Sequence, residues 1–266
     1  MSGGDIAPPS PLLFAGEMLG VLGVARLLAS APFLAAAPRG DGHAVIVLPG
    51  LGATDRSTWA IRGYLGRLGY KAAGWRLGRN DRLPGADVPV IARQARALCE
   101  ATRRPVSLVG WSRGGIIARE ASRLAPEAVR MVVTLGSPFA APAATNVVSS
   151  WRLLTGERFR APSPEALRRL AAPLPVPSTS IYSRTDGVVA WRACREIPGP
   201  QSENVEVRGS HVGLGFNPAA LWVIADRLAQ PPGKWAPFEP SPILAPFFPR
   251  SESASRDRPP GENSGI

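Results

Sequence analysis

Short apolar runs alternate along most of the chain with longer segments in which apolar residues recur every three or four positions. The short runs have the length of strands, and the longer segments have the periodicity of amphipathic helices. Strands of a parallel sheet are buried on both faces, so their sequences are continuously apolar. The alternation therefore predicts an α/β fold with a mostly parallel central sheet and helices on both faces. The expected strands are residues 44–48, 71–75, 105–109, 130–135, 178–182 and 204–207, and the expected helices are residues 57–68, 88–102, 116–124 and 219–229.

Two stretches do not follow this alternation. Residues 139–177 place about forty residues, rich in alanine and proline, between two expected strands. We expect two short helical pieces there, one at residues 146–154 and one beginning at Ser163-Pro164, where a serine N-cap precedes proline at the first helical position. Residues 231–266 form a C-terminal extension whose aromatic residues are expected to pack on the domain, whereas the part after Arg250 is polar enough to predict disorder.

Residues 12–31 are rich in leucine, valine and alanine and predict a helix with almost no polar face. Such a helix needs cover on most sides, from the main domain, a second chain or a bilayer, and docking on the main domain is the default expectation. Glu17 and Arg26 interrupt it, so it lacks the ~20 apolar residues of a membrane-spanning helix. The predicted division is an N-terminal helical extension at 1–42, a domain at 43–230 and the C-terminal extension.

The chain of 266 residues carries a net charge of +11, yet its basic residues form no cluster. Only two of the 31 are lysines, and no run exceeds two adjacent basic residues. Nucleic acid is therefore not expected as a partner, and an anionic membrane surface contacted through residues 12–31 is the alternative that the charge suggests. The oligomeric state cannot be inferred from this pattern.

Cysteine usage and the N-terminus bear on localisation. Two cysteines are too few for a disulfide framework and lack the spacing of metal ligands, which predicts buried or semi-buried thiols in a reducing compartment. The chain opens Met-Ser-Gly-Gly-Asp, without the basic start of a secretory signal. We therefore expect a cytoplasmic protein, with membrane association as a variant; secretion, with cleavage near residues 29–31 or 35–37, is the alternative.

Gly110-Trp111-Ser112-Arg113-Gly114 has the form Gly-x-Ser-x-Gly and lies between an apolar strand and a helix. In that context the motif marks a sharp strand-to-helix turn that exposes the serine above the sheet. Gly110 and Gly114 remove side chains that would collide around the strained corner. The N-terminus of the following helix favours developing negative charge. Ser112 is therefore the candidate nucleophile.

A serine hydroxyl needs a base and an orienting acid before it can act as a nucleophile. Of the two histidines, His43 precedes the first strand, at the opposite end of the sheet from Ser112, and we interpret it as an exposed turn residue. His211 follows strand 204–207 and so lies at the same edge as Ser112. Asp186 is the only carboxylate in the loop after strand 178–182, which makes it the candidate acid.

The same chemistry needs backbone N–H groups that bind an oxyanion. The first strand ends in Leu48-Pro49-Gly50-Leu51-Gly52, whose glycines let the backbone approach closely and turn its amides inward. We expect the N–H groups of Leu51 and of Arg113, the residue after the nucleophile, to form the oxyanion hole.

The chain resembles the α/β-hydrolase superfamily, and within it the bacterial lipases and esterases, over about residues 43–230. The motifs that carry the resemblance are Leu48-Pro49-Gly50-Leu51-Gly52, Gly110-Trp111-Ser112-Arg113-Gly114-Gly115, Leu135-Gly136-Ser137-Pro138, Asp186-Gly187-Val188-Val189 and Ser210-His211-Val212-Gly213. The resemblance implies the α/β-hydrolase fold and a Ser-His-Asp mechanism through an acyl-enzyme, with no metal or cofactor. The chain departs from many lipases at Pro49 and Trp111, where those lipases have histidine. These two differences weaken any transfer of substrate specificity.

The resemblance also implies that residues 139–177 form a short helical cap or lid. Expected substrate or lid contacts are Trp111, Trp151, Leu153 and Leu154; the alternative for the cap residues is simple packing of a cap helix. The leading hypothesis is a serine hydrolase that cleaves carboxylic esters, including lipid-like acyl esters. A thioesterase or acyltransferase would use the same triad, and a non-catalytic membrane-associated binding protein of the same fold is the alternative from another class.

Overall fold

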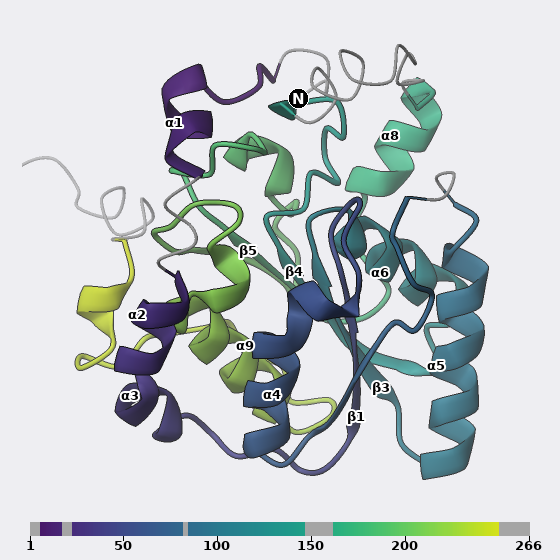
Figure 1. Ribbon diagram of the computed structural model, residues 1–266. Coiled ribbons are helices and arrows are strands. Elements are labelled where there is room, and N and C mark those ends of the chain that lie inside the picture. Colours follow the sequence, from purple (N-terminus) through teal and green to yellow (C-terminus); the bar gives the residue numbers. More distant parts are fainter. Residues whose placement is uncertain (1–5, 18–22, 82–84, 147–161, 250–266) are drawn as a thin grey trace, which may run out of the picture.

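The computed structural model describes residues 6–17, 23–81, 85–146 and 162–249, and it has an α/β architecture (Figure 1). Six strands form one sheet in the order β2-β1-β3-β4-β5-β6, and all neighbouring pairs are parallel. The strands are β1 (Ala44–Leu48), β2 (Lys71–Gly74), β3 (Val106–Trp111), β4 (Val129–Leu135), β5 (Ser178–Tyr182) and β6 (Ser202–Glu206). The predicted fold class and parallel sheet are confirmed.

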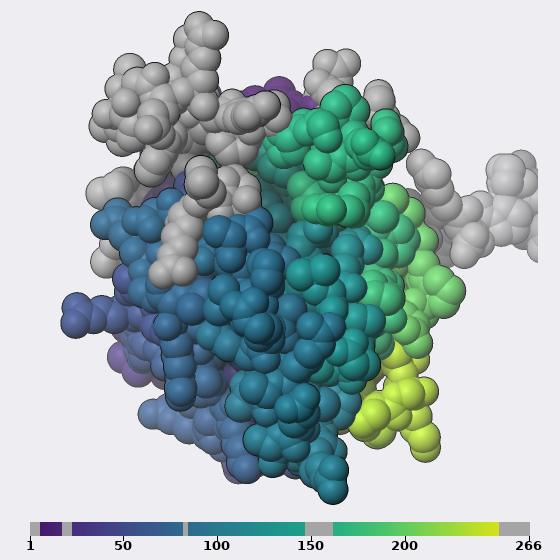
Figure 2. Space-filling model, turned by 90° about the vertical axis from the view of Figure 1, so that its right-hand side faces the viewer, coloured from purple at the N-terminus to yellow at the C-terminus, as the bar shows by residue number. Residues whose placement is uncertain are grey.

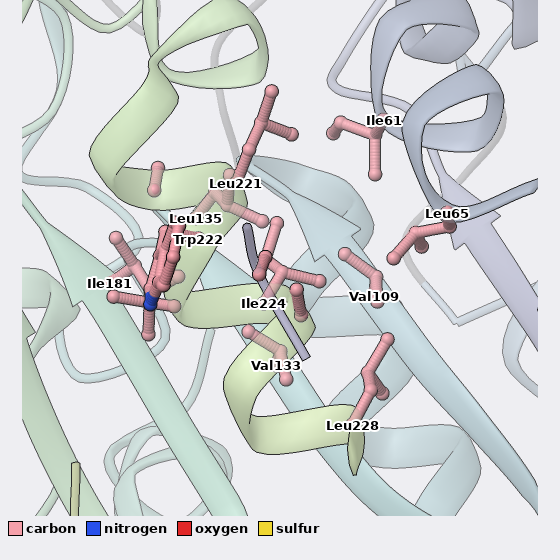
Figure 3. Close-up of a cluster of buried hydrophobic side chains, with 14 of the residues drawn as sticks. Ile61, Leu65, Val109, Val133, Leu135, Ile181, Leu221, Trp222, Ile224 and Leu228 are labelled. Carbon is pink, nitrogen blue, oxygen red and sulfur yellow. The ribbon is translucent and has the colours of Figure 1, made fainter. Parts of the chain in front are cut away.

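Helices cover both faces of the sheet. On one face lie α4 (Trp59–Arg67) and α9 (Pro218–Ala229), and Figure 3 shows their apolar side chains against those of β3, β4 and β5. The opposite face is covered by α5 (Val88–Thr102) and α6 (Arg113–Leu124), the side that Figure 2 turns toward the viewer. Because both faces are covered, β1, β3 and β5 are buried at every residue. Burial on both faces explains the apolar sequence of β1 and of most of β3, whereas β5 (Ser178–Tyr182) begins with three buried hydroxyl residues.

The N-terminal extension differs from the single helix predicted over residues 12–31. The described part forms three short helices, α1 (Pro11–Gly16), α2 (Gly23–Ala29) and α3 (Ala31–Ala35). Pro32 does not end a helix but lies in the first turn of α3, where a missing N–H costs nothing. These helices dock on the domain, as expected by default: the ring of Phe33 lies 4.6 Å from that of Trp222 in α9. No helix in the described residues is long and apolar enough to span a membrane.

The two irregular stretches are described in part. Helix α8 (Pro164–Ala171) begins as predicted, with the Ser163 hydroxyl accepting a hydrogen bond from the N–H of Ala166. The helix predicted at 146–154 falls almost entirely outside the described residues. After α9, the C-terminal extension packs back on the domain through the expected aromatic residues: Phe248 is buried in the core cluster that contains Trp222, and Trp235 and Phe238 pack against that cluster. Residues 250–266, predicted to be disordered, lie outside the described part.

Candidate active site

Ser112 forms the corner between β3 and α6. Its backbone has φ 55° and ψ −124°, a conformation that non-glycine residues rarely adopt. Its N–H donates to the carbonyl of Leu135 at 2.7 Å, and its own carbonyl accepts from the N–H of Gly115 at 3.0 Å. The corner is thus fixed by both the neighbouring strand β4 and the first turn of α6, and it places the serine at the carboxyl edge of the sheet.

The glycines around Ser112 permit close backbone contacts on both sides of the corner. A Cβ atom on Gly110 would lie 2.3 Å from Cα of Gly115, and one on Gly114 would lie 2.5 Å from the carbonyl oxygen of Leu48. Gly115 is equally restricted, because a Cβ there would lie 2.0 Å from the hydroxyl oxygen of Ser137. The collisions are therefore with the start of α6 and with neighbouring strands.

Asp186 and His211 are brought together from the loops that follow β5 and β6. Oδ2 of Asp186 lies 2.7 Å from Nδ1 of His211, and both side chains are buried. The second carboxylate oxygen, Oδ1, accepts from the N–H groups of Val188 at 2.9 Å and Val189 at 2.7 Å. These two donors fix the carboxylate plane, so that Oδ2 faces the imidazole.

The environment favours the protonated form of His211. Burial acts to lower its pKa, but the charge of Asp186, the hydrogen bond to that carboxylate and the charge of Glu17 together raise the pKa above its usual value of 6.5. An imidazole with this surrounding is a stronger base than a free one and can take up the proton of a nucleophile.

Ser112 and His211 approach the same backbone segment, at the end of β4. A Cβ on Gly136 would lie 3.0 Å from Nδ1 of His211 and 3.1 Å from Oδ2 of Asp186, and Ser112 is hydrogen-bonded to the preceding residue, Leu135. Within the described part of the chain, Ser112 Oγ makes no hydrogen bond. In enzymes without bound substrate, the hydrogen bond between a nucleophile and its base is often long, and it shortens when substrate binds.

The loop after β1 lies directly beside the serine. A Cβ on Gly50 would be 3.3 Å from Cβ of Ser112, and the N–H of Leu51 has no hydrogen-bond partner in the described residues. The backbone of Gly52 has φ 70°, which turns the loop back toward the domain. Leu51 is thus placed where its N–H can face a group bound at Ser112, and Arg113 supplies the first N–H of α6.

Asn80, which the sequence analysis did not single out, anchors this loop. Its side-chain NH₂ group donates to the carbonyl of Pro49 at 2.7 Å, and its backbone carbonyl accepts from the N–H of Gly52 at 2.7 Å. The guanidinium of Arg113 donates to the same carbonyl at 3.2 Å. Asn80 is fully buried and so joins the two segments expected to supply the oxyanion hole. Its place in the polar loop after β2, at the carboxyl edge, is the one sequence signal that could have indicated it.

Glu17 and Gly136 were also missed. Glu17, directly after α1, is buried and accepts hydrogen bonds from the N–H of Gly187, next to Asp186, and from the N–H of His211. Gly136 lies in the predicted Leu-Gly-Ser-Pro motif, but its position against the Asp186–His211 contact depends on how β4, β5 and β6 pack. An acidic residue in an otherwise apolar N-terminal stretch was the available signal for Glu17.

His43 is buried, and its interpretation as an exposed turn residue is wrong. Its Nδ1 faces Oδ1 of Asp41 at 2.5 Å, and its Nε2 lies 2.8 Å from the hydroxyl of Ser107 on β3. Burial and the charges of Arg130 and Arg104 lower the pKa of His43, although Asp41 opposes them. This second Ser-His-Asp array lies at the amino end of the sheet, as predicted, and Ser107 is fully buried, so no substrate reaches it.

Of the predicted substrate contacts, Trp111 lies in the described residues. Its side chain is 8% exposed and packs on Gly215 and Phe216 of η4 (Leu214–Phe216), the turn after His211. Trp111 therefore packs against the turn that follows His211. Trp151, Leu153 and Leu154 lie outside the described residues. Among residues that are described, no three His, Cys, Asp or Glu side chains form a metal-binding group, and Cys99 and Cys194 are free thiols.

Comparison with known proteins identifies the fold. No family model matches the sequence, and no curated protein matches it. Among solved structures, lipase B of Aspergillus fumigatus superposes with a TM-score of 0.54 at 18% identity, covering 74% of this chain and 55% of the lipase. The mature lipase BlEst2 of Bacillus licheniformis gives a TM-score of 0.52 at 19% identity, covering 73% of this chain and 93% of that one. The chain thus spans little more than half of the fungal lipase.

Proposed function

Because this chain has the α/β-hydrolase fold, we propose that it is a serine hydrolase that cleaves carboxylic esters. Ser112 is the nucleophile, His211 the general base and Asp186 the residue that orients the imidazole. The observation that carries the proposal is the 2.7 Å contact between Asp186 and His211 at the sheet edge where Ser112 occupies a strained corner. Fold alone would not distinguish an enzyme from a binding protein.

The reaction follows from the positions of these groups. Ser112 Oγ forms a bond to the ester carbonyl carbon while its proton passes to Nε2 of His211. The oxyanion accepts hydrogen bonds from the N–H groups of Leu51 and Arg113. The carbon–oxygen bond to the alcohol then breaks, and the alcohol leaves with the proton from His211. Water attacks the acyl-enzyme by the same steps in reverse, releasing the carboxylic acid and restoring the serine hydroxyl.

Apolar surroundings and the structural neighbours favour an ester with an apolar acyl chain. Leu51 is 38% exposed and Trp59 is 49% exposed, and the ring of Trp59 lies 5.9 Å from that of Phe216, next to the histidine loop. Two proteins of similar fold are named lipases. Hydrolysis of a thioester or transfer of the acyl group to another acceptor would use the same triad and differs only in the second step.

A membrane surface is the proposed source of such esters. Leu12 in α1 is 86% exposed and Leu28 in α2 is 69% exposed. An apolar groove of about 410 Å³ between α2, α3 and α4 contains Leu28 and Trp59 and is flanked by Arg39 and Arg67. Exposed apolar side chains beside arginines suit the boundary of an anionic bilayer.

Hydrolysis of p-nitrophenyl esters tests the proposed function. The protein is expected to release p-nitrophenol from butyrate and octanoate esters, and Ser112→Ala is expected to abolish release. Ser107→Ala is the matched control, because Ser107 also contacts a histidine but is buried at the far end of the sheet. Equal rates for wild type and Ser112→Ala would contradict the proposal.

A further inference from the structure

Glu17 connects the N-terminal extension to both loops that carry the catalytic pair. Its Oε1 accepts from the N–H groups of Gly187 and His211, each at 2.7 Å. Its Oε2 accepts from the N–H of Val212 at 2.8 Å. Gly187 directly follows Asp186, so one carboxylate holds the backbone next to the acid and the backbone of the base itself. An ionised carboxylate can only accept hydrogen bonds, and the three backbone donors use both of its oxygens.

The surrounding packing is built for this contact. A Cβ on Gly187 would lie 2.2 Å from the carbonyl oxygen of Leu13, so α1 rests on the acid loop at a place that only glycine allows. The side-chain amide of Asn146 donates to the carbonyls of Pro9 at 3.2 Å and Gly187 at 2.8 Å, a second link between the two segments. Glu17 is 8% exposed, and hydrogen bonds to a buried charged acceptor are among the stronger ones.

We infer that Glu17 is a positioning residue for the Asp186–His211 pair, and that the N-terminal segment through α1 is part of the catalytic unit. This inference rests on the proposed function, which gives the pair its role. Glu17 touches no reacting atom; it acts by fixing the two loops and by placing a negative charge next to the imidazole. Without it, the buried N–H groups of Gly187 and His211 and the part-buried N–H of Val212 lose their acceptor, and an unpaired buried N–H is costly.

The charge of Glu17 gives the inference a spectroscopic readout. In the described residues, the charged groups that act on His211 are Asp186 from the loop after β5 and Glu17 from the end of α1. Arg26 of α2 lines, with Ser210 and Gly213, a cavity of about 420 Å³ beside the histidine loop. The two carboxylates stabilise the imidazolium, so removing one is expected to lower the pKa of His211.

Proton NMR titration of Glu17→Gln is the test. The chain has only two histidines, so the Cε1–H signal of His43 serves as an internal reference. The pKa of His211 is expected to fall in Glu17→Gln and to stay unchanged in Glu196→Gln, the matched control. Glu196 is also a buried glutamate, but it pairs with Arg119 instead of the catalytic loops. An unchanged pKa of His211 in Glu17→Gln would overturn the inference.

Kinetics separate positioning from simple stability. Glu17→Gln is expected to lower kcat by about 10- to 100-fold through misplaced groups, with KM little changed, whereas Glu196→Gln keeps the wild-type kcat. A Glu17→Gln enzyme with wild-type kcat would overturn the inference while leaving the proposed function intact. If the wild type has no esterase activity, the proposed function fails, and the NMR titration still decides whether Glu17 acts on His211.

Amide hydrogen exchange of the wild type covers the case in which Glu17→Gln does not fold. The N–H groups of Gly187, His211 and Val212 lie in loops outside the sheet, and their acceptor is Glu17. They are expected to exchange slowly, like amides of the core. Rapid exchange of all three would overturn the inference without any variant.

Discussion

The carboxylate of Asp186 meets the imidazole of His211 at 2.7 Å, and its other oxygen is held by two backbone N–H groups. In the neutral imidazole, this arrangement favours the tautomer with the proton on Nδ1, donated to Oδ2. Nε2 then carries the lone pair that, in the proposed mechanism, takes up the proton of Ser112. In the proposed mechanism, the loops after β5 and β6 thus orient the base for the serine at the end of β3.

Asp186→Asn is expected to reverse that tautomer. The amide oxygen would take over the hydrogen bonds from Val188 and Val189, so the NH₂ group would face Nδ1 of His211 and force its proton onto Nε2. We expect kcat for ester hydrolysis to fall by about four orders of magnitude while the fold is kept. Steady-state kinetics and a thermal melt measure both. Asp81→Asn, at a half-exposed surface position, is the control, and a kcat for Asp186→Asn within tenfold of that control would contradict the assignment.

Asn80→Ala tests the support of the expected oxyanion hole. The change removes the hydrogen bond to the Pro49 carbonyl and frees the loop that carries Leu51. The expected result is a loss of about 10- to 100-fold in kcat, because a displaced donor no longer meets the oxyanion. KM is expected to change little. The control is Asn204→Ala, which removes the hydrogen bonds between the Asn204 side chain in β6 and the backbone of Glu196. Equal losses of kcat in the two variants would argue against a specific role for Asn80.

His43 predicts how stability depends on pH. Its pKa is lowered in the folded state, so below about pH 6.5 the unfolded chain binds more protons than the folded one. The contribution of His43 to the free energy of unfolding therefore falls as the pH drops from 6.5 toward the folded pKa of His43. His211 acts in the opposite sense, because its raised pKa stabilises the fold at low pH and that stability is lost as the pH rises through the folded value.

Thermal melting of wild type and His43→Asn between pH 5 and 7 checks this dependence. The wild type is expected to lose Tm more steeply toward pH 5 than the variant, which lacks the titrating group. The variant is also expected to keep esterase activity, since His43 lies at the amino end of the sheet. Parallel Tm curves for the two proteins would show that His43 does not supply the slope.

Membrane contact is tested with vesicles. The protein is expected to sediment with phosphatidylglycerol vesicles more than with phosphatidylcholine vesicles, and less so at high salt. The double variant Leu12→Asp, Leu28→Asp is expected to lose this binding. Ile243→Asp is the matched control, because Ile243 is 83% exposed but lies in the C-terminal extension. Equal binding by the double variant and the control would contradict the proposed surface.

The apolar runs predicted β1, β3 and β4 well, because a strand buried on both faces is apolar over most of its length. Asp186 and His211 could be proposed because each follows a strand, and the loops after parallel strands lie at the same edge of the sheet. The local pattern could not place Glu17, which lies 170 and 194 positions from Gly187 and His211, its hydrogen-bond partners. Its role exists only after the N-terminal helices dock.

The environment of His43 was predicted wrongly, also because it depends on distant residues. A histidine between glycine and an apolar run has the local sequence of an exposed turn residue. Its burial depends on Asp41, Ser107 and Arg130, which come from three separate segments. The helix predicted over residues 12–31 was expected to end before Pro32. Proline in a first turn begins a helix as readily as it ends one, and Pro32 lies in the first turn of α3.

Labelling with a fluorophosphonate probe tests the central claim most directly. The probe reacts only with a serine whose hydroxyl is activated by a neighbouring base. We predict labelling of the wild type and of Ser107→Ala, and none of Ser112→Ala or His211→Ala. Labelling that persists in folded Ser112→Ala, or a folded wild type that remains unlabelled with and without detergent, would contradict the assignment of Ser112 as an activated nucleophile.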